Sequence, residues 1–257
     1  MSQGNSYEPE ALLSSLGIRQ PRDINVEVIA QYCGATVVYE PLTACEARVL
    51  GLGNRAIITV NSNSIEARRR FSAAHELAHW VHDRGKLAAA CTATTIRNSW
   101  GSDREARANE YASNLLLPKS MFVPRVKGRD ITFVTVDVLR EEFNTSMTAT
   151  AIRLVRQGPS PSMLICSSKS GREWFVASSE VERRLWPRKD VGENTAAYDL
   201  LRGGIVPDRA QDVDADEWID RDDADEYFVR EHSRKVNDGR VLTLLWWKDQ
   251  RQINALG

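Results

Sequence analysis

The sequence predicts an α+β protein: a mainly helical first part with a small antiparallel sheet, a short helix-turn-helix, and a C-terminal α/β domain. Three observations support this prediction. β-branched segments between residues 35 and 61 are typical of strands, and long alanine-rich helical segments follow them. Residues 157–162, Gln-Gly-Pro-Ser-Pro-Ser, then have the composition of a linker. We therefore expect three parts: residues 1–118, 119–157 and 158–257.

The first part is predicted to begin with two short helices, residues 8–17 and 24–32. Cys33-Gly34 is the expected stop of the second helix, because glycine can adopt the left-handed cap. Three strand candidates follow, at residues 35–39, 46–50 and 56–61. Residues 51–56 resemble a dinucleotide fingerprint, but a strand follows them rather than a helix, so we expect a hairpin turn there.

Two longer helices are predicted next. One surrounds residues 71–80, with Asn63 or Ser64 as its cap and Gly85 as its stop. The other spans residues 103–117. Further helices are expected at the positions of the helix-turn-helix, residues 132–144 and 146–157.

The last part combines strand-like and irregular segments. Its strand candidates are residues 163–167, 174–177, 226–231 and 241–247, with a hairpin turn signal at 236–240. The acidic run of residues 208–226 holds ten acidic residues and two arginines, and we expect it to be a solvated loop. The run therefore has a net charge of −8. Since the whole chain has a net charge of −1, the charges of the other residues sum to +7.

Composition argues against membrane-spanning and secreted classes. Hydrophobic residues make up 42% and charged residues 27% of the 257 positions, as in soluble globular proteins. The polar N-terminal segment lacks the apolar core of a secretory signal, and the longest apolar run, residues 241–247, is too short to cross a bilayer. The four cysteines are scattered, which favours a reduced, cytoplasmic setting without membrane contact.

One short pattern indicates chemistry. Residues 75–79, His-Glu-Leu-Ala-His, form an H-E-x-x-H. On a helix, positions i and i+4 lie on one face, so His75 and His79 direct two imidazoles at one point, as a zinc ion requires. Glu76 lies on the shoulder of that face, where it can act as general base without replacing a ligand. The pattern predicts a metalloprotease-type zinc site.

The alternative for this pattern is a surface helix with scattered histidines and glutamates. Against it, three of the four histidines fall within eight residues, and the residues around them are small or apolar. We therefore expect the histidine face to be buried. His82, the third of these histidines, is expected behind the site or on the surface rather than as a fourth ligand.

Glu105 is the candidate third ligand. Glu105, Ala108, Asn109 and Ala112 share a face of their helix by spacing. A carboxylate on the buried side of a helix needs a reason to be there, and ligating zinc supplies one. Asn109 could then form a hydrogen bond to one of the zinc-binding side chains, on the side away from the metal. The alternative is a carboxylate in water near the N-terminus of the helix.

Together, residues 71–79 and 105–118 resemble the ImmA/IrrE family of bacterial and phage metallopeptidases. The family pattern is an AHELxH helix followed by ExxANxFAxxLLxP, and the resemblance covers residues 10–157. The chain departs from it with Ala78, where glycine is frequent, and with Tyr111, where phenylalanine is frequent.

The resemblance implies a zincin-like core in which His75, His79 and Glu105 hold zinc and Glu76 is the base. It also implies cleavage of a helix-turn-helix repressor in response to stress or DNA damage, releasing genes for stress response, mobile-element transfer or phage defence. Some relatives carry a GAF-like sensor after the core, which suggests a regulatory role for residues 158–257. The alternative function is a DNA-binding transcriptional regulator with a non-catalytic zinc core. A structural site usually has four protein ligands, whereas three leave the open position that catalysis needs.

Nucleic acid is a second expected partner. Arg153 and Arg156 lie on the second helix of the predicted helix-turn-helix, although such a pair of helices can also pack a core or hold a substrate. The basic surplus, with Trp100, Trp174 and Trp186 available for stacking, makes single-stranded DNA a candidate activator. The alternative is that these tryptophans belong to the core.

Cys91 is a candidate inhibitory ligand. It lies twelve residues after His79, between the two helices that carry the predicted ligands. A thiolate in the open zinc position would displace the water that Glu76 activates, and oxidation of the sulfur would release it. The alternative is a small buried cysteine without a role.

Overall fold

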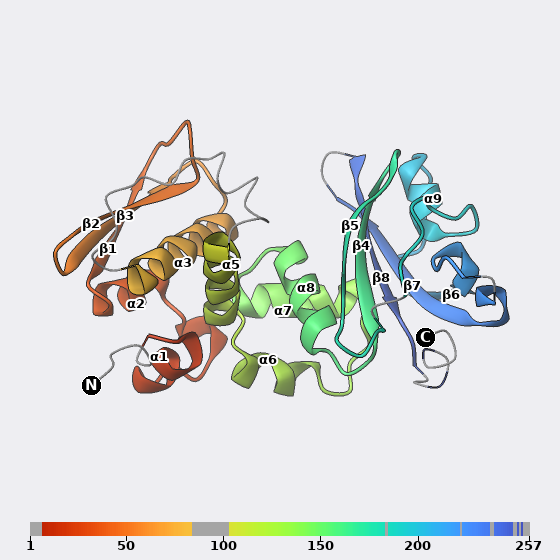
Figure 1. Ribbon diagram of the computed structural model, residues 1–257, viewed down its shortest axis with the longest axis horizontal. Coiled ribbons are helices and arrows are strands. Elements are labelled where there is room, and N and C mark those ends of the chain that lie inside the picture. Colours follow the sequence, from red (N-terminus) through yellow and green to blue (C-terminus); the bar gives the residue numbers. More distant parts are fainter. Residues whose placement is uncertain are drawn as a thin grey trace. The chain divides into compact units, whose positions relative to one another are not determined.

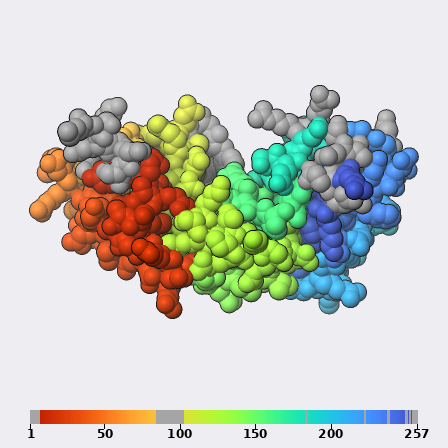
Figure 2. All heavy atoms as spheres, turned by 90° about the horizontal axis from the view of Figure 1, so that it is seen from below, coloured from red at the N-terminus to blue at the C-terminus, as the bar shows by residue number. Residues whose placement is uncertain are grey.

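The computed structural model describes residues 7–83, 103–182, 185–221, 223–236, 239–248, 251 and 253, which Figures 1 and 2 draw in colour. The fold is α+β, as predicted, with two sheets. The chain divides into two compact units. Unit 1 comprises residues 1–122 and 140–146, and unit 2 comprises residues 123–139 and 147–257. The expected three-part division stays a prediction.

Unit 1 begins with the two predicted short helices, α1 (Pro9–Ser15) and α2 (Val26–Tyr32). The side chain of Asn25 accepts the Val28 N–H and thereby caps the start of α2. Gly34 follows the end of α2 with a φ of 82°, a conformation that glycine adopts without the steric cost of a side chain.

The sheet of unit 1 consists of β1 (Ala35–Glu40), β2 (Ala47–Leu52) and β3 (Arg55–Asn61), in the order β1-β3-β2. β2 and β3 form the expected antiparallel hairpin, but β1 and β3 pair in parallel, so the prediction of a purely antiparallel sheet is wrong. After β1, the chain first forms the far strand β2 and then returns through the hairpin, so that β3 lies between β1 and β2. The strand that fills the centre is β3, which has the most buried residues of the three.

Helix α3 (Glu66–His82) packs on this sheet, against β2 and β3 (Figure 1). The interface is made of small and branched apolar side chains, including Ala73, Leu77, Ile58 and Val60. The prediction that Asn63 or Ser64 caps this helix is wrong. Ile65 occupies the N-cap position, and no side chain caps the helix. Ser64 instead donates its hydroxyl to Glu46 Oε2 at 2.6 Å. Gly85, the predicted stop, lies outside the described residues.

Helix α5 (Asp103–Leu116), the second predicted long helix, packs against α3. A further helix that the sequence analysis did not predict, α6 (Lys119–Val126), follows at once. The Pro118 carbonyl accepts the N–H groups of Met121 and Phe122, so the proline that stops α5 also starts α6.

The two helices expected for a helix-turn-helix are present as α7 (Phe133–Phe143) and α8 (Met147–Gln157). Asn144, in the connection between them, has a φ of 50°. Arg156 is exposed, but Arg153 is buried. Arg153 is therefore unavailable for the surface contact with DNA that was considered for it.

Unit 2 contains a five-stranded antiparallel sheet in the order β5-β4-β8-β7-β6. Its strands are β4 (Ser162–Ser168), β5 (Gly171–Ala177), β6 (Gln211–Asp214), β7 (Phe228–Lys235) and β8 (Val241–Trp246), and the short helix α9 (Ala196–Leu201) packs on β7. The predicted turn joins β7 to β8, where the Val236 N–H bonds the Arg240 carbonyl at 2.9 Å. The GAF-like assignment stays a prediction.

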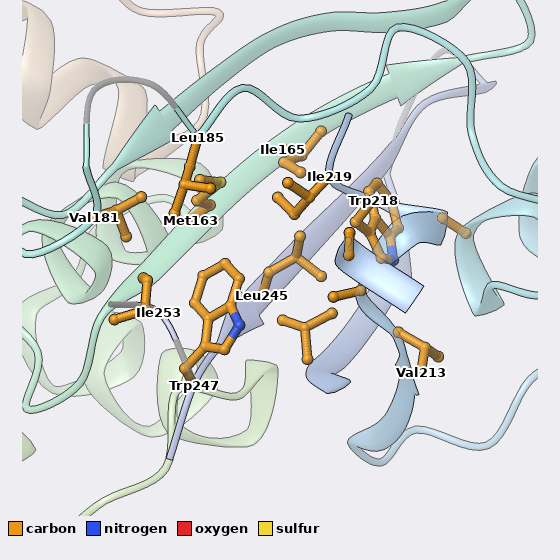
Figure 3. Packing of buried hydrophobic residues seen from close by; sticks show 14 of the residues in the cluster. Met163, Ile165, Val181, Leu185, Val213, Trp218, Ile219, Leu245, Trp247 and Ile253 are labelled. Carbon is orange, nitrogen blue, oxygen red and sulfur yellow. The ribbon is translucent and has the colours of Figure 1, made fainter. Parts of the chain in front are cut away.

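The acidic run is not the solvated loop that its charge suggested. It contains β6 and two 3-10 turns, Ala215–Glu217 and Ala224–Glu226. The apolar residues between its carboxylates are buried in the core of unit 2, where Figure 3 shows Trp218 and Ile219 close to Leu245 and Val213 toward the edge of the cluster. The acidic side chains therefore form the outer face of a packed segment. Among the described helices, none has the length and apolarity to span a membrane.

Candidate metal centre

Two histidines of α3 face one point. His75 and His79 lie one turn apart, and their Nε2 atoms are 3.1 Å from each other. Their rings are nearly perpendicular, with centroids 4.8 Å apart. Both side chains are buried, since α3 packs between the sheet and α5. The helical spacing therefore produces the convergence that the sequence predicted.

Glu105, in the first turn of α5, brings a carboxylate to the same point. Its Oε2 lies 3.1 Å from His75 Nε2, and its Oε1 lies 3.3 Å from His79 Nε2. Glu105 is buried, which excludes the alternative of a helix-terminal carboxylate in water. The two ligand-bearing helices are also joined by an ion pair at 2.8 Å between Asp83, after the end of α3, and Arg104. No sequence motif indicated this pair.

The three donors fit a divalent metal ion. Their ligand atoms all lie within 4.8 Å of one another, in the single group of this kind that the described residues contain. Burial lowers the pKa of both His75 and His79, which keeps the imidazoles neutral and able to donate lone pairs. Two imidazoles with one carboxylate are also a donor set of catalytic zinc sites.

Asn109 fixes the orientation of His75. It lies one turn after Glu105 on α5, and its Oδ1 is 3.0 Å from His75 Nδ1. An amide oxygen can only accept, so His75 Nδ1 carries the proton and Nε2 keeps its lone pair. That tautomer presents the correct nitrogen to a metal ion.

Glu76 is the unusual member of the group. It is 0% exposed, and neither of its carboxylate oxygens has a hydrogen-bond partner within the described parts of the chain. Burial, reinforced by the charge of Glu105, raises the pKa of Glu76 to about 8. A buried carboxylate without donors is costly for folding, so its presence beside the ligands needs a reason outside packing.

The remaining candidates take different positions. His82 packs edge-on against Tyr111, with ring centroids 5.4 Å apart, and is not part of the metal group. Trp174 is half-buried and Trp186 is 58% exposed. Cys91 and Trp100 lie outside the described residues, so the inhibitory-ligand hypothesis stays a prediction. The sequence motifs did not indicate Cys45. Burial raises the pKa of its thiol, and the nearby charge of Glu76 raises it further.

A buried pair of helical histidines with a carboxylate ligand and a second, unpaired carboxylate defines the metallopeptidase class of centre. Residues 30–155, which contain the whole group, match the profile of the IrrE N-terminal-like domain, peptidase family M78. Residues 30–155 therefore form an IrrE N-terminal-like domain, and the resemblance seen in the two motifs is confirmed.

A solved structure gives a second comparison. A transcriptional regulator from Mycobacterium tuberculosis matches 93% of this chain and 74% of its own length, with a TM-score of 0.59 and 16% sequence identity. At this identity the likeness shows a shared fold alone. None of the curated proteins matches the chain.

Proposed function

We propose that this protein is a zinc-dependent endopeptidase that cleaves a partner helix-turn-helix repressor. The observation that carries the proposal is the convergence of His75, His79 and Glu105 beside a buried carboxylate, Glu76, that has no hydrogen-bond partner among the described residues. The family match over residues 30–155 supports the peptidase part of it.

Each residue of the centre has a distinct task. His75, His79 and Glu105 hold the ion, and Asn109 keeps His75 in the tautomer that can do so. When bound, zinc supplies Lewis acidity, which polarises a substrate carbonyl and makes a water molecule more acidic. Glu76 would accept a proton from the attacking water and pass it to the leaving amine, because burial and the charge of Glu105 raise its pKa and its oxygens have no hydrogen-bond partner among the described residues.

Strand β2 offers a place for an extended substrate segment. It is one of the two edge strands of the described sheet, and α3 packs against it. Leu50 and Leu52 on β2 are 65% and 86% exposed. A peptide that adds to this edge would gain main-chain hydrogen bonds as well as apolar contacts. This requirement favours a substrate cut in an exposed or locally unfolded segment.

The physiological setting is proposed from the family resemblance. Cleavage of the repressor in response to stress or DNA damage would release its target genes, with mobile-element transfer and phage defence as further settings in the cytoplasm. Single-stranded DNA is the proposed activator, for which exposed Trp186 and half-buried Trp174 provide stacking surfaces.

The second candidate function is a DNA-binding transcriptional regulator with a non-catalytic metal core. The fold likeness to a protein described as a transcriptional regulator favours it. The burial of Arg153 speaks against base contacts by the α8 arginine pair. A centre with three protein ligands also has the open position that catalysis needs.

The experiment that separates the two functions is incubation of the purified protein with the repressor encoded beside its gene. Endopeptidase function predicts two discrete repressor fragments that disappear after chelation and return with added zinc. Intact repressor in the presence of zinc and single-stranded DNA, together with a sequence-specific DNA shift by the protein alone, would support the regulator instead.

A further inference from the structure

The polar contacts between α3 and α5 continue beyond the metal ligands. Within the metal group, Glu105 of α5 lies 3.1 Å from His75 and 3.3 Å from His79. The next contact is the ion pair of Arg104 Nε with Asp83 Oδ2, at 2.8 Å. Asp83 follows His79 by one helical turn, and Arg104 immediately precedes Glu105 in the chain. The pair therefore joins the two helices directly beside the ligands.

Each charge of this pair has an unfavourable position in its own helix. Asp83 is the C-cap residue of α3, at the negative end of the helix dipole, where a cation would be stabilised. Arg104 is the second residue of α5, at the positive end, where an anion would be stabilised. Neither charge stabilises the helix that carries it, so the compensating interaction is the one between the two helices.

The contact between the two side chains is shielded from water. Arg104 Nε and Asp83 Oδ2 are both buried, although the side chains as a whole are 42% and 18% exposed. Neither atom has an aligned hydrogen bond within the described residues, so the attraction is that of an ion pair. Salt screens a shielded pair less than an exposed one, and this pair should therefore contribute more than a typical surface ion pair.

We propose that Asp83 and Arg104 are positioning residues, which hold the first turn of α5 so that the Glu105 carboxylate is in place before a metal ion binds. This inference rests on the zinc site of the proposed function. Of the three ligands in the metal group, only Glu105 lies on α5, so movement of that turn changes its distance from both histidines. A ligand that the fold already holds in place loses less conformational freedom on binding, which raises the affinity.

Positioning and simple charge repulsion predict opposite results for one variant. Arg104 carries a positive charge next to a ligand and repels a bound cation, so repulsion alone predicts tighter zinc binding by Arg104→Gln. Positioning predicts that Arg104→Gln binds zinc about threefold to tenfold more weakly. Asp83→Asn should weaken binding by a similar factor, and the double variant by no more than either single one, because all three lose the same contact. Arg107→Gln, which removes an exposed cation from the same helix, should bind zinc no more weakly than the wild type.

Two measurements on the full-length protein test the proposal. Competition with a chelator of known affinity gives the zinc affinities. Hydrogen–deuterium exchange of the zinc-free protein then reports on the helix without any metal. The amides of residues 107–109 bond to carbonyls in the first turn of α5, so they should exchange faster in Arg104→Gln, whereas exchange at residues 112–116 should not change.

Four results would overturn the proposal. They are zinc binding by Arg104→Gln as tight as or tighter than that of the wild type, additive losses in the double variant, unchanged exchange at residues 107–109, and faster exchange throughout unit 1. Failure of the wild type to bind zinc would instead refute the proposed zinc-dependent function. The exchange of the zinc-free protein would in that case still decide whether the pair holds the first turn of α5.

Discussion

Two glutamates of this protein are equally buried but differ in their surroundings. Glu76 beside the metal ligands and Glu231 on β7 are both 0% exposed. Glu231 accepts the Ala196 and Ala197 N–H groups at the start of α9 and the hydroxyl of Ser233. Glu76 accepts nothing from the described residues. The difference separates a carboxylate that builds the fold from one without partners among the described residues, which suits the catalytic role proposed for it.

The histidines show the same contrast. On β7, His232 accepts the Phe133 N–H at Nδ1 and bonds Asp208 through Nε2 at 2.9 Å, so both ring nitrogens have partners. In the metal group, the Nε2 atoms of His75 and His79 face each other and the Glu105 carboxylate, all of them candidate metal ligands. Burial alone therefore does not identify a functional group, whereas burial with unmatched hydrogen-bonding capacity does.

The largest expected effect concerns the ligands themselves. His75→Ala, His79→Ala and Glu105→Ala should each lose the bound zinc and, with it, repressor cleavage, because two remaining donors cannot hold the ion against solvent. Metal analysis of the purified variants measures this directly. His232→Ala is the matched control, since it removes a buried histidine that lies outside the metal group. Full zinc content in Glu105→Ala would remove that residue from the ligand set.

Glu231 should matter for stability instead. Glu231→Gln replaces an acceptor of three hydrogen bonds with a group that can satisfy only some of them, and should lower the free energy of unfolding by about 1–3 kcal/mol. Zinc content should not change. Chemical denaturation followed by circular dichroism gives the value, and a variant as stable as the wild type would argue against a structural role for this carboxylate.

The same variant has a predicted pH dependence. Burial raises the pKa of Glu231 above its ordinary value of 4.5, although its hydrogen bonds oppose the shift. A raised folded-state pKa contributes stability that is present below pH 4.5 and is lost as the pH rises through the folded-state value. The stability difference between wild type and Glu231→Gln should therefore shrink with rising pH. A difference that grows instead would contradict the direction of the shift.

Asn109 should have a smaller effect on the metal than the ligands themselves. Asn109→Ala removes the acceptor that fixes the His75 tautomer, while all three ligands remain. We expect zinc affinity to fall about 10- to 100-fold, the range typical for partners that orient a ligand. Competition with a chelator of known affinity measures this change. Asn109→Asp, which keeps an acceptor oxygen, should bind zinc more tightly than Asn109→Ala, and an equal loss in both would point to a packing defect.

The sequence predicted the centre well because helical spacing is a local property. His75, His79 and Glu105 could be placed on their helix faces from residue intervals alone. Strand order is not local, so nothing in the sequence indicated that β3 would take the centre of its sheet beside β1. The prediction for the acidic run was wrong for another reason. It was based on the charge of the run and did not take account of the apolar residues, such as Trp218, that lie between the carboxylates.

The most direct test of the central claim is repressor cleavage by zinc-loaded Glu76→Gln, compared with zinc-loaded wild type and Glu231→Gln. If Glu76 is the general base, its substitution should slow cleavage by about 10²- to 10⁴-fold without changing the zinc stoichiometry. Glu231→Gln, a change to an equally buried carboxylate, should cleave at the wild-type rate while folded. Cleavage by Glu76→Gln at the wild-type rate would contradict the account, because the unpaired carboxylate beside the ligands would then have no part in the chemistry.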